Sequence, residues 1–251
     1  MTQAHAFLCH GYRFEKGVEI SESALPKNLE RHFKALRIRS GEAVSFLDGE
    51  GTITDAVCIS VKPFSFEISS VETHPPTTPG LHLVLSPPRR DTLSQTISQA
   101  TEMGVTRMSF LITDHNDYSQ KEREPLVERS QRVLEAAVEQ CRAPYLPKLE
   151  TAWLTLAQTL SAIEGPAFFA DEDLSRQGLY GLERVPSALV NAAELTLFVG
   201  PEGGWSSAER ALISQSPCVH PLGLGPRILK VPTACVAALY QIRILSKGIS
   251  Q

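Results

Sequence analysis

The chain has 251 residues, 42% of them hydrophobic and 21% charged, and its formal net charge at pH 7 is −4. This balance is typical of a soluble globular protein with one large domain or two smaller ones. No apolar run approaches the roughly 20 residues that a membrane span needs, and the N-terminus shows no signal-peptide pattern. The acidic net charge excludes RNA binding through bulk positive charge, so any contact with nucleic acid requires a local basic patch.

The five cysteines are scattered along the chain and form no Cys-x-x-Cys pair. Such spacing argues against a disulfide framework or a zinc site and favours a reducing, cytoplasmic environment. The seven histidines show no metal-ligand spacing, so we expect no metal centre. A Gly-x-Ser-x-Gly elbow is also missing from the sequence, which makes a nucleophilic hydrolase a poor interpretation.

Residues 1–73 are predicted to form mostly strands. The β-rich segments 43–47 and 52–57 flank an Asp-Gly-Glu-Gly turn, which is typical of a hairpin because glycine tolerates positive φ. Residues 64–68 alternate apolar and polar side chains, as a half-buried strand does. Residues 27–39 are predicted to be helical, with five basic side chains against one acidic one, and Lys27, Arg31 and Lys34 on one face. That face is either an RNA-contacting patch or a solvated helix surface.

Prolines in residues 73–80 predict a linker, since they resist both helix and central strand. Beyond it, helical and strand-like segments alternate, which predicts an α/β domain with a mainly parallel sheet. The predicted strands are 81–85, 108–112, 167–170 and 195–199, and the predicted helices are 92–103, 121–141 and 155–164. We therefore expect two domains, residues 1–73 and residues 80–251.

A first glycine-rich loop, Gly-Pro-Glu-Gly-Gly at 200–204, follows the apolar strand 195–199. Ser206 and Glu209 then form the capping-box pattern that opens a helix. Strand, tight loop and helix is the geometry with which α/β proteins bind ligands at the carboxyl ends of strands. The loop is neither Gly-x-Gly-x-x-Gly nor a P-loop, so a dinucleotide or triphosphate site is not indicated. Taken alone, such a turn favours a purely structural role.

A second Gly/Pro-rich loop begins at the strand that starts at Val219 and extends through Leu229. A helix of small residues, 233–239, follows, with Pro232 near its first turn. Two such loops after consecutive strands can together wall a nucleoside-sized pocket. Arg227 is interpreted either as a pocket residue or as a salt-bridge partner, and the helix either as a pocket wall or as core packing.

The order of these motifs resembles the RsmE family, SPOUT-superfamily methyltransferases that act on N3 of a uridine in small-subunit (16S) ribosomal RNA. Gly-Pro-Glu-Gly-Gly stands about twenty residues before Leu-Gly-Pro-Arg-Ile-Leu at 224–229. Three further segments carry the likeness: Gln-Ala-Thr-Glu-Met-Gly-Val at 99–105, Glu-Gln-Cys at 139–141, and Phe-Leu-Asp-Gly at 46–49. The resemblance covers nearly the whole chain.

This resemblance implies a C-terminal SPOUT-type parallel sheet with a trefoil knot and a small N-terminal PUA-like β-barrel that binds RNA. It also implies a homodimer, no metal, S-adenosylmethionine as cofactor, and ribosomal RNA or the small ribosomal subunit as partner. The cofactor would be held largely through backbone groups of the two loops. The implied cofactor residues are Phe198, Gly200, Pro201, Glu202, Gly203, Gly204, Leu222, Gly223, Leu224, Gly225, Arg227, Ile228 and Leu229.

Uracil N3 lies on the pairing edge and carries a proton, so the base must be unpaired or flipped out. A cationic side chain near O2 or O4 would stabilise the anion that develops. The catalytic candidates are Arg227, His115 and Arg89, of which Arg227 is preferred because it lies inside the recognised loop. The candidate RNA contacts are Lys27, Arg31, Lys34, Arg37, Arg90 and Arg142.

Three departures from the family pattern fall at polar positions. Lys-Val-Pro at 230–232 stands where the family has Arg-Thr-Glu, Asp-His-Asn at 114–116 where it has Glu-Arg-Ser, and Arg-Ala at 142–143 where it has Gly-Arg. These changes at Val231, Pro232, His115 and Ala143 leave two alternatives open. One is a SPOUT methyltransferase with a different RNA target, and the other is a non-catalytic RNA-binding or ribosome assembly factor. The proton acceptor and the choice between free RNA and assembled subunit are also open.

Overall fold

The computed structural model describes residues 4–116, 118–173, 180–181 and 192–248. The chain divides into two compact units, Met1–Pro76 with Glu135–Leu146, and Thr77–Leu134 with Pro147–Gln251. The break after Pro76 falls within the linker that the prolines predict. No sequence pattern indicated that residues 135–146 belong to the first unit.

The first unit contains a five-stranded sheet in the order β1-β3-β4-β5-β2. Its elements are β1 (His5–Leu8), β2 (Glu19–Ser21), a 3-10 helix (Glu22–Ala24), α1 (Leu29–Leu36), β3 (Ala43–Leu47), β4 (Thr52–Val61) and β5 (Phe64–Thr73). The predicted hairpin is confirmed, since β3 and β4 pair antiparallel with Val44 opposite Ala56. Gly49 and Gly51 of its turn have φ of 74° and 116°, values that side-chain-bearing residues rarely adopt.

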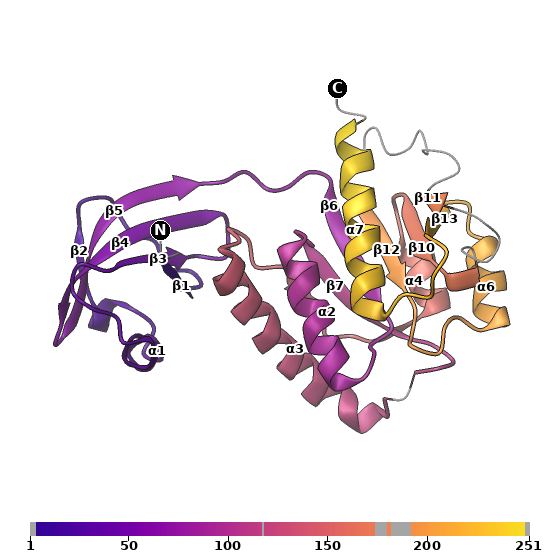
Figure 1. Ribbon diagram of the computed structural model, residues 1–251, viewed down its shortest axis with the longest axis horizontal. Helices are drawn as coiled ribbons and strands as arrows, with labels where there is room; N and C mark the ends of the chain where they lie inside the picture. The colour runs from indigo at the N-terminus through magenta and orange to yellow at the C-terminus, as the bar shows by residue number, and fades with distance from the viewer. Residues whose placement is uncertain (1–3, 117, 174–179, 182–191, 249–251) are drawn as a thin grey trace. The chain divides into compact units, whose positions relative to one another are not determined.

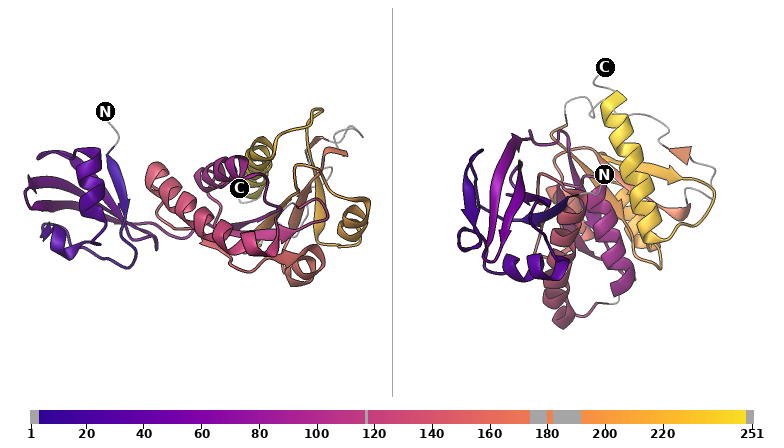
Figure 2. Two further views of the ribbon diagram at one scale, coloured as in Figure 1. Left: turned by 90° about the horizontal axis from the view of Figure 1, so that it is seen from below. Right: turned by 60° about the vertical axis from the view of Figure 1, so that its left-hand side comes forward.

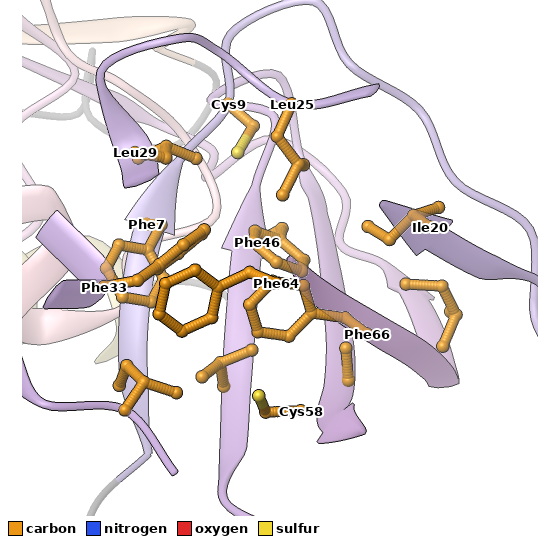
Figure 3. Close-up of a cluster of buried hydrophobic side chains, with 14 residues drawn as sticks. Phe7, Cys9, Ile20, Leu25, Leu29, Phe33, Phe46, Cys58, Phe64 and Phe66 are labelled. Carbon is orange, nitrogen blue, oxygen red and sulfur yellow. The ribbon is translucent and has the colours of Figure 1, made fainter. Parts of the chain in front are cut away.

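Phenylalanines form the core of this unit, as Figure 3 shows. Phe33 of α1 meets Phe7 of β1 edge to face, with ring centroids 4.9 Å apart. Phe46 of β3 and Phe66 of β5 also meet edge to face, at 5.3 Å. This is the geometry that the ring quadrupole favours. Because Leu29 and Phe33 are one helical turn apart, α1 presents one apolar face to the sheet.

The prediction that Lys27, Arg31 and Lys34 share one face of α1 is wrong in part. The helix begins at Leu29, after a turn in which the amide of Leu29 donates to the carbonyl of Pro26, so Lys27 lies before the helix. Arg37 is the C-cap residue with a left-handed φ of 55°, and Lys34 is paired with Glu30. Lys27, Arg31, Lys34 and Arg37 are all exposed, but they do not form one helical row.

The second unit contains an eight-stranded sheet in the order β11-β13-β10-β12-β6-β7-β8, with β9 beside β7. Every described pair is parallel except β11 with β13, which confirms the predicted α/β class. The strands are β6 (Gly80–Leu85), β7 (Arg107–Ile112), β8 (Lys148–Leu149), β9 (Leu154–Thr155), β10 (Ala167–Ala170), β11 (Tyr180–Gly181), β12 (Glu194–Val199) and β13 (Val219–Leu224). The central strands β6, β10 and β12 are buried over almost their whole length, including the polar residues His82 and Thr196, because both faces of the sheet are covered.

Helices cover both faces of this sheet. The helices of this unit are α2 (Arg90–Glu102), α3 (Gln120–Cys141) up to residue 134, α4 (Leu156–Ala162), α6 (Ser207–Ser214) and α7 (Val231–Gly248). Helices α2 and α7 lie side by side on one face, while α4 and α6 contact each other on the other (Figures 1 and 2). The predicted boundaries of α2, α3 and α4 agree within two residues, whereas α7 extends well beyond the predicted segment 233–239. Gly104, the predicted stop after α2, has φ of 80°. None of the described helices is long and apolar enough to cross a membrane.

The parallel arrangement brings the carboxyl ends of β6, β7, β10, β12 and β13 to one edge of the sheet. Between β12 and β13, the two strands that precede the glycine-rich loops, lies β10. The loops that follow these five strands therefore meet at this edge, where α/β proteins commonly bind their ligands.

Candidate functional site

A cavity of about 450 Å³ opens at the carboxyl edge of the sheet. This volume lies within the range of small-molecule sites. Loops after β10, β12 and β13 and the first turn of α7 wall the cavity, and Thr92 of α2 completes it. The other lining residues are Ala170, Asp171, Glu172, Val199, Gly200, Pro201, Glu202, Gly204, Trp205, Leu224, Arg227, Ile228, Leu229, Lys230, Val231 and Ala234.

The loop after β12 is built around Trp205. Its indole Nε1–H donates to the carbonyl oxygen of Ala170 at 3.0 Å, which ties the loop to the end of β10. A Cβ atom on Gly200 would lie 2.8 Å from this indole ring, so the backbone comes this close only because residue 200 has no side chain. Gly204 adopts φ of 72°. The glycines of the motif are thus required by the conformation of the cavity wall.

An ion pair holds the loop after β10. Nε and one terminal nitrogen of Arg210, on α6, donate to the two carboxylate oxygens of Asp171 at 2.6 and 3.0 Å. Such bidentate pairs are geometrically specific. The Asp171 side chain is only 4% exposed, and its hydrogen bonds raise the pKa of Arg210. Asp171 therefore lines the cavity, and Arg210 of α6 holds its carboxylate in place.

A second, more open hollow of about 760 Å³ lies next to the first. Pro201 and Glu202 line both. Its other lining residues follow β6, β7 and β12: Pro87, Pro88, Arg89, Arg90, Asp114, His115, Tyr118, Glu122 and Gly203. The two hollows therefore share one wall, the tip of the glycine-rich loop.

The charged side chains of the second hollow are loosely paired. Nε of Arg89 lies 3.7 Å from a carboxylate oxygen of Glu202, and Arg90 lies 3.5 Å from Glu122. Ion pairs this exposed contribute little stability, so they exchange readily for another anion. Tyr118 is better fixed, because its hydroxyl donates to the carbonyl of Pro88 at 2.7 Å and burial raises its pKa.

The predicted capping box at Ser206 and Glu209 is confirmed, and it also binds the loop after β7. The amide of Ser206 donates to one carboxylate oxygen of Glu209 at 2.8 Å, and the amide of Asp114 donates to the other at 2.9 Å. In return, the hydroxyl of Ser206 donates to Asp114 at 2.5 Å. Glu209 is only 7% exposed, so its charge is satisfied by backbone groups of two separate loops.

His115 lies against the glycine-rich loop. Its Nδ1 is 2.8 Å from the carbonyl oxygen of Gly204, and a Cβ atom on Gly203 would be 3.3 Å from Cβ of His115. The histidine thereby joins the wall of the second hollow to a residue that lines the first.

Residues 76–243 match the family model described as the RNA methyltransferase domain. The chain belongs to this family. The methyltransferase is 27% identical over 240 residues to ribosomal RNA small subunit methyltransferase E of Synechocystis sp., covering 92% of this chain and 75% of the relative. The enzyme of the same name from Rickettsia conorii is 29% identical over 171 residues, covering 68% and 67%. The resemblance to the RsmE family is confirmed.

Two solved structures share the fold of the methyltransferase over nearly the whole chain. Ribosomal RNA small subunit methyltransferase E from Neisseria gonorrhoeae, bound to S-adenosylmethionine, superposes with a TM-score of 0.80 at 22% identity, covering 97% of this chain and 98% of that one. A protein of Legionella pneumophila in complex with the same cofactor gives 0.79 at 22% identity and the same coverage.

Eight of the thirteen predicted cofactor residues of the methyltransferase line the first cavity: Gly200, Pro201, Glu202, Gly204, Leu224, Arg227, Ile228 and Leu229. Gly203 lines the second hollow instead. Phe198 and Leu222 are fully buried within their strands, and Gly223 and Gly225 are not among the lining residues.

The predicted catalytic and RNA-contact residues are divided among three places. Arg227 lines the first cavity, whereas Arg89, Arg90 and His115 line the second hollow. Arg142 belongs to the first unit, where its guanidinium donates to Asp55 at 2.8 Å. Arg142 also has φ of 54°, so it ends α3 and is already paired.

Sequence reasoning missed several lining residues of the methyltransferase. Asp171 and Glu172 directly follow β10, and Pro87 and Pro88 come just after β6. Their position immediately after a predicted parallel strand was the available signal. Tyr118 lies farther from its strand and had no such signal. Among the described residues, no cluster of three or more His, Cys, Asp or Glu side chains is arranged to hold a metal.

Proposed function

We propose that this RNA methyltransferase transfers a methyl group from S-adenosylmethionine to N3 of a uridine in small-subunit (16S) ribosomal RNA. The observation that carries the proposal is the pair of adjoining hollows that share Pro201 and Glu202. One has the size and lining for a nucleoside cofactor, and the other offers cations and an imidazole to an RNA base. The relatives named ribosomal RNA small subunit methyltransferase E support the substrate class.

The first cavity fits S-adenosylmethionine in size and in chemistry. Apolar groups of Leu229 and Val231 suit an adenine ring, and Gly200 and Gly204 bring backbone groups close to a ligand. The carboxylate of Glu172 can accept hydrogen bonds from ribose hydroxyls or an ammonium group. When bound, the cofactor supplies a methyl group already activated by a positively charged sulfur. The protein's task is then chiefly to align the acceptor with it.

The second hollow suits an unpaired uridine. Its position beside the glycine-rich loop would bring a base that has left its stack close to the methyl donor. Arg89 and Arg90 can release their weak carboxylate partners, Glu202 and Glu122, and contact RNA phosphates or uracil oxygens instead. Negative charge on the uracil ring would be stabilised by such cations.

For the whole protein we infer a PUA-like, RNA-binding first domain (1–73) and a SPOUT domain with a trefoil knot (80–251). The five-stranded sheet with exposed cations on and around α1 supports the first assignment, and the superposition on known methyltransferases supports the second. A homodimer is supported by Tyr240 and Ile244, which lie one turn apart on α7 and are 58% and 51% exposed. The proposed ribosomal substrate also supports a cytoplasmic location.

The decisive experiment offers labelled S-adenosylmethionine and the purified protein to small ribosomal subunits that lack the modification, followed by nucleoside analysis. We expect labelled N3-methyluridine, and no label on subunits that already carry the modification. Calorimetry with S-adenosylmethionine separates cofactor binding from transfer. A different labelled nucleoside would assign another RNA target. Cofactor binding without transfer to any subunit or RNA would indicate a non-catalytic RNA-binding role.

A further inference from the structure

The hydrogen bond between His115 and Gly204 determines the tautomer of the imidazole. The carbonyl oxygen of Gly204 can only accept, so Nδ1 at 2.8 Å must carry the hydrogen and donate it. In the neutral ring the other nitrogen, Nε2, then holds a free electron pair. Within the described parts of the chain, Nε2 has no hydrogen-bond partner. His115 is exposed and lines the second hollow, where that electron pair is available to a ligand.

The loop that carries His115 is held firmly, as a group that acts on a substrate must be. Glu209 accepts from the backbone of Asp114, the residue before His115, and Ser206 donates to the Asp114 carboxylate. Both partners begin α6, directly after the glycine-rich loop. Three hydrogen bonds thus fix the loop that carries His115 to the glycine-rich loop and the start of α6: Glu209 and Gly204 accept from it, and Ser206 donates to it.

We propose that Nε2 of His115 accepts the N3 proton of the target uracil. The assignment rests on the proposed function and names the group that completes it. As the proton moves to Nε2, the electron pair of the N–H bond stays on N3 and forms the bond to the methyl carbon. The carbon–sulfur bond breaks, and its electron pair returns to sulfur, which becomes a neutral thioether. The imidazolium afterwards releases its proton to water.

The charges around the second hollow suit both partners of this proton transfer. Glu202 and Asp114 line the same hollow as His115 and stabilise the imidazolium that forms. Arg89 and Arg90 line it as well and favour the uracil anion. A proton transferred within this hollow therefore leaves each new charge near groups of opposite sign.

Two substitutions separate proton transfer from loop positioning. The side-chain amide of His115→Asn can still donate to Gly204 in the place of Nδ1–H, but it offers no basic nitrogen. His115→Ala loses both functions. If Nε2 is the base, both variants should lower kcat about 100-fold or more, the usual contribution of general acid–base catalysis. The KM for RNA and the Kd for S-adenosylmethionine should stay within about threefold, and added imidazole should partly restore His115→Ala.

His10 provides the matched control, because its Nδ1 also contacts a backbone carbonyl, that of Asp48 at 3.1 Å, at an exposed position. His10→Ala should methylate at the wild-type rate. If His115→Asn also kept the wild-type rate, His115 would serve only to position the loop and the proposal would be overturned.

A measurement on the resting protein tests the tautomer independently of activity. A long-range proton–nitrogen correlation spectrum, with His115 assigned by comparison with His115→Asn, should show the hydrogen on Nδ1. A hydrogen on Nε2 would remove the base and refute the proposal, whatever the activity. If wild-type protein methylates no uridine, the proposed function fails, and the spectrum still reports on the histidine.

Discussion

Glu209 is expected to contribute more stability than a helix cap alone. Its two carboxylate oxygens accept from the backbone amides of Ser206 and Asp114. Glu209→Ala leaves both partly buried N–H groups without this partner, and an unsatisfied donor that is shielded from water costs about 1–3 kcal/mol. Glu209→Gln keeps the shape of the side chain, but only one atom of the amide can accept, so one donor is orphaned.

We therefore expect Glu209→Gln to lower the free energy of unfolding by about 2 kcal/mol and Glu209→Ala by about 4 kcal/mol. The matched control is Gln158, which forms a capping box with Thr155 at the start of α4 and is exposed. Within the described residues, the Gln158 side chain forms hydrogen bonds only with Thr155, so Gln158→Ala should cost only about 1 kcal/mol, the usual value for a cap.

Urea unfolding followed by tryptophan fluorescence measures this difference directly. Trp153 and Trp205, the two tryptophans of the chain, both lie in the second unit, so their emission reports on the unit that contains Glu209. The midpoint should shift while the slope of free energy against urea stays constant. A loss of about 1 kcal/mol for Glu209→Ala, equal to that of Gln158→Ala, would refute the idea that Glu209 joins two loops.

Three further outcomes follow from the geometry. Gly200→Ala places a Cβ atom 2.8 Å from the Trp205 indole. We therefore expect weaker binding of S-adenosylmethionine, measured by calorimetry, and a change in Trp205 fluorescence. If both were unchanged, the packing of Gly200 against Trp205 would be contradicted. Arg210→Ala removes the ion-pair partner of the buried Asp171 carboxylate, so affinity for S-adenosylmethionine should fall about tenfold. Adding Asp171→Asn to this variant should partly restore the affinity. Wild-type affinity in Arg210→Ala would show that the ion pair does not shape the cavity. Burial lowers the pKa of His82 to about 3, whereas an unfolded histidine titrates near ~6.5, so the free energy of unfolding should decrease by ~4–5 kcal/mol as pH falls from ~6.5 to ~3. His82→Gln should lack this part of the pH dependence. The free energy of unfolding is measured by urea titration at several pH values. If it changed with pH equally in wild type and His82→Gln, the role of His82 would be disproved.

Local signals in the sequence were enough to predict most elements of the fold. Gly104 ends α2 because φ of 80° suits glycine, and the Ser206–Glu209 pattern opens α6 because its groups satisfy the first amides of the helix. The start of α1 could not be predicted to the residue, since the turn from Pro26 to Leu29 precedes it. The strand order was equally out of reach, because β10 lies between β12 and β13 through contacts that no local pattern encodes.

The two hollows differ in how far they could be predicted, and the reason is physical. The wall of the first depends on backbone conformation at Gly200 and Gly204, where a side chain would collide or strain the chain. Such a requirement leaves a recognisable glycine motif in the sequence. The second hollow depends on side chains that meet across long sequence separations, as when the hydroxyl of Ser206 donates to the carboxylate of Asp114, 92 positions away.

The difference between a backbone-determined cavity and a side-chain-determined hollow predicts how substitutions near each one affect methyl transfer. A substitution in the segment 114–116 is expected to change the side chains that line the second hollow, whereas the wall of the first cavity depends on Gly200 and Gly204 themselves. Cofactor binding and choice of substrate can therefore vary independently in this fold. Gly204 both lines the first cavity and accepts the hydrogen bond from His115, so one of the links between the two hollows is a backbone carbonyl. Side-chain substitution cannot remove that carbonyl, so the histidine tautomer is specified by the cofactor loop itself.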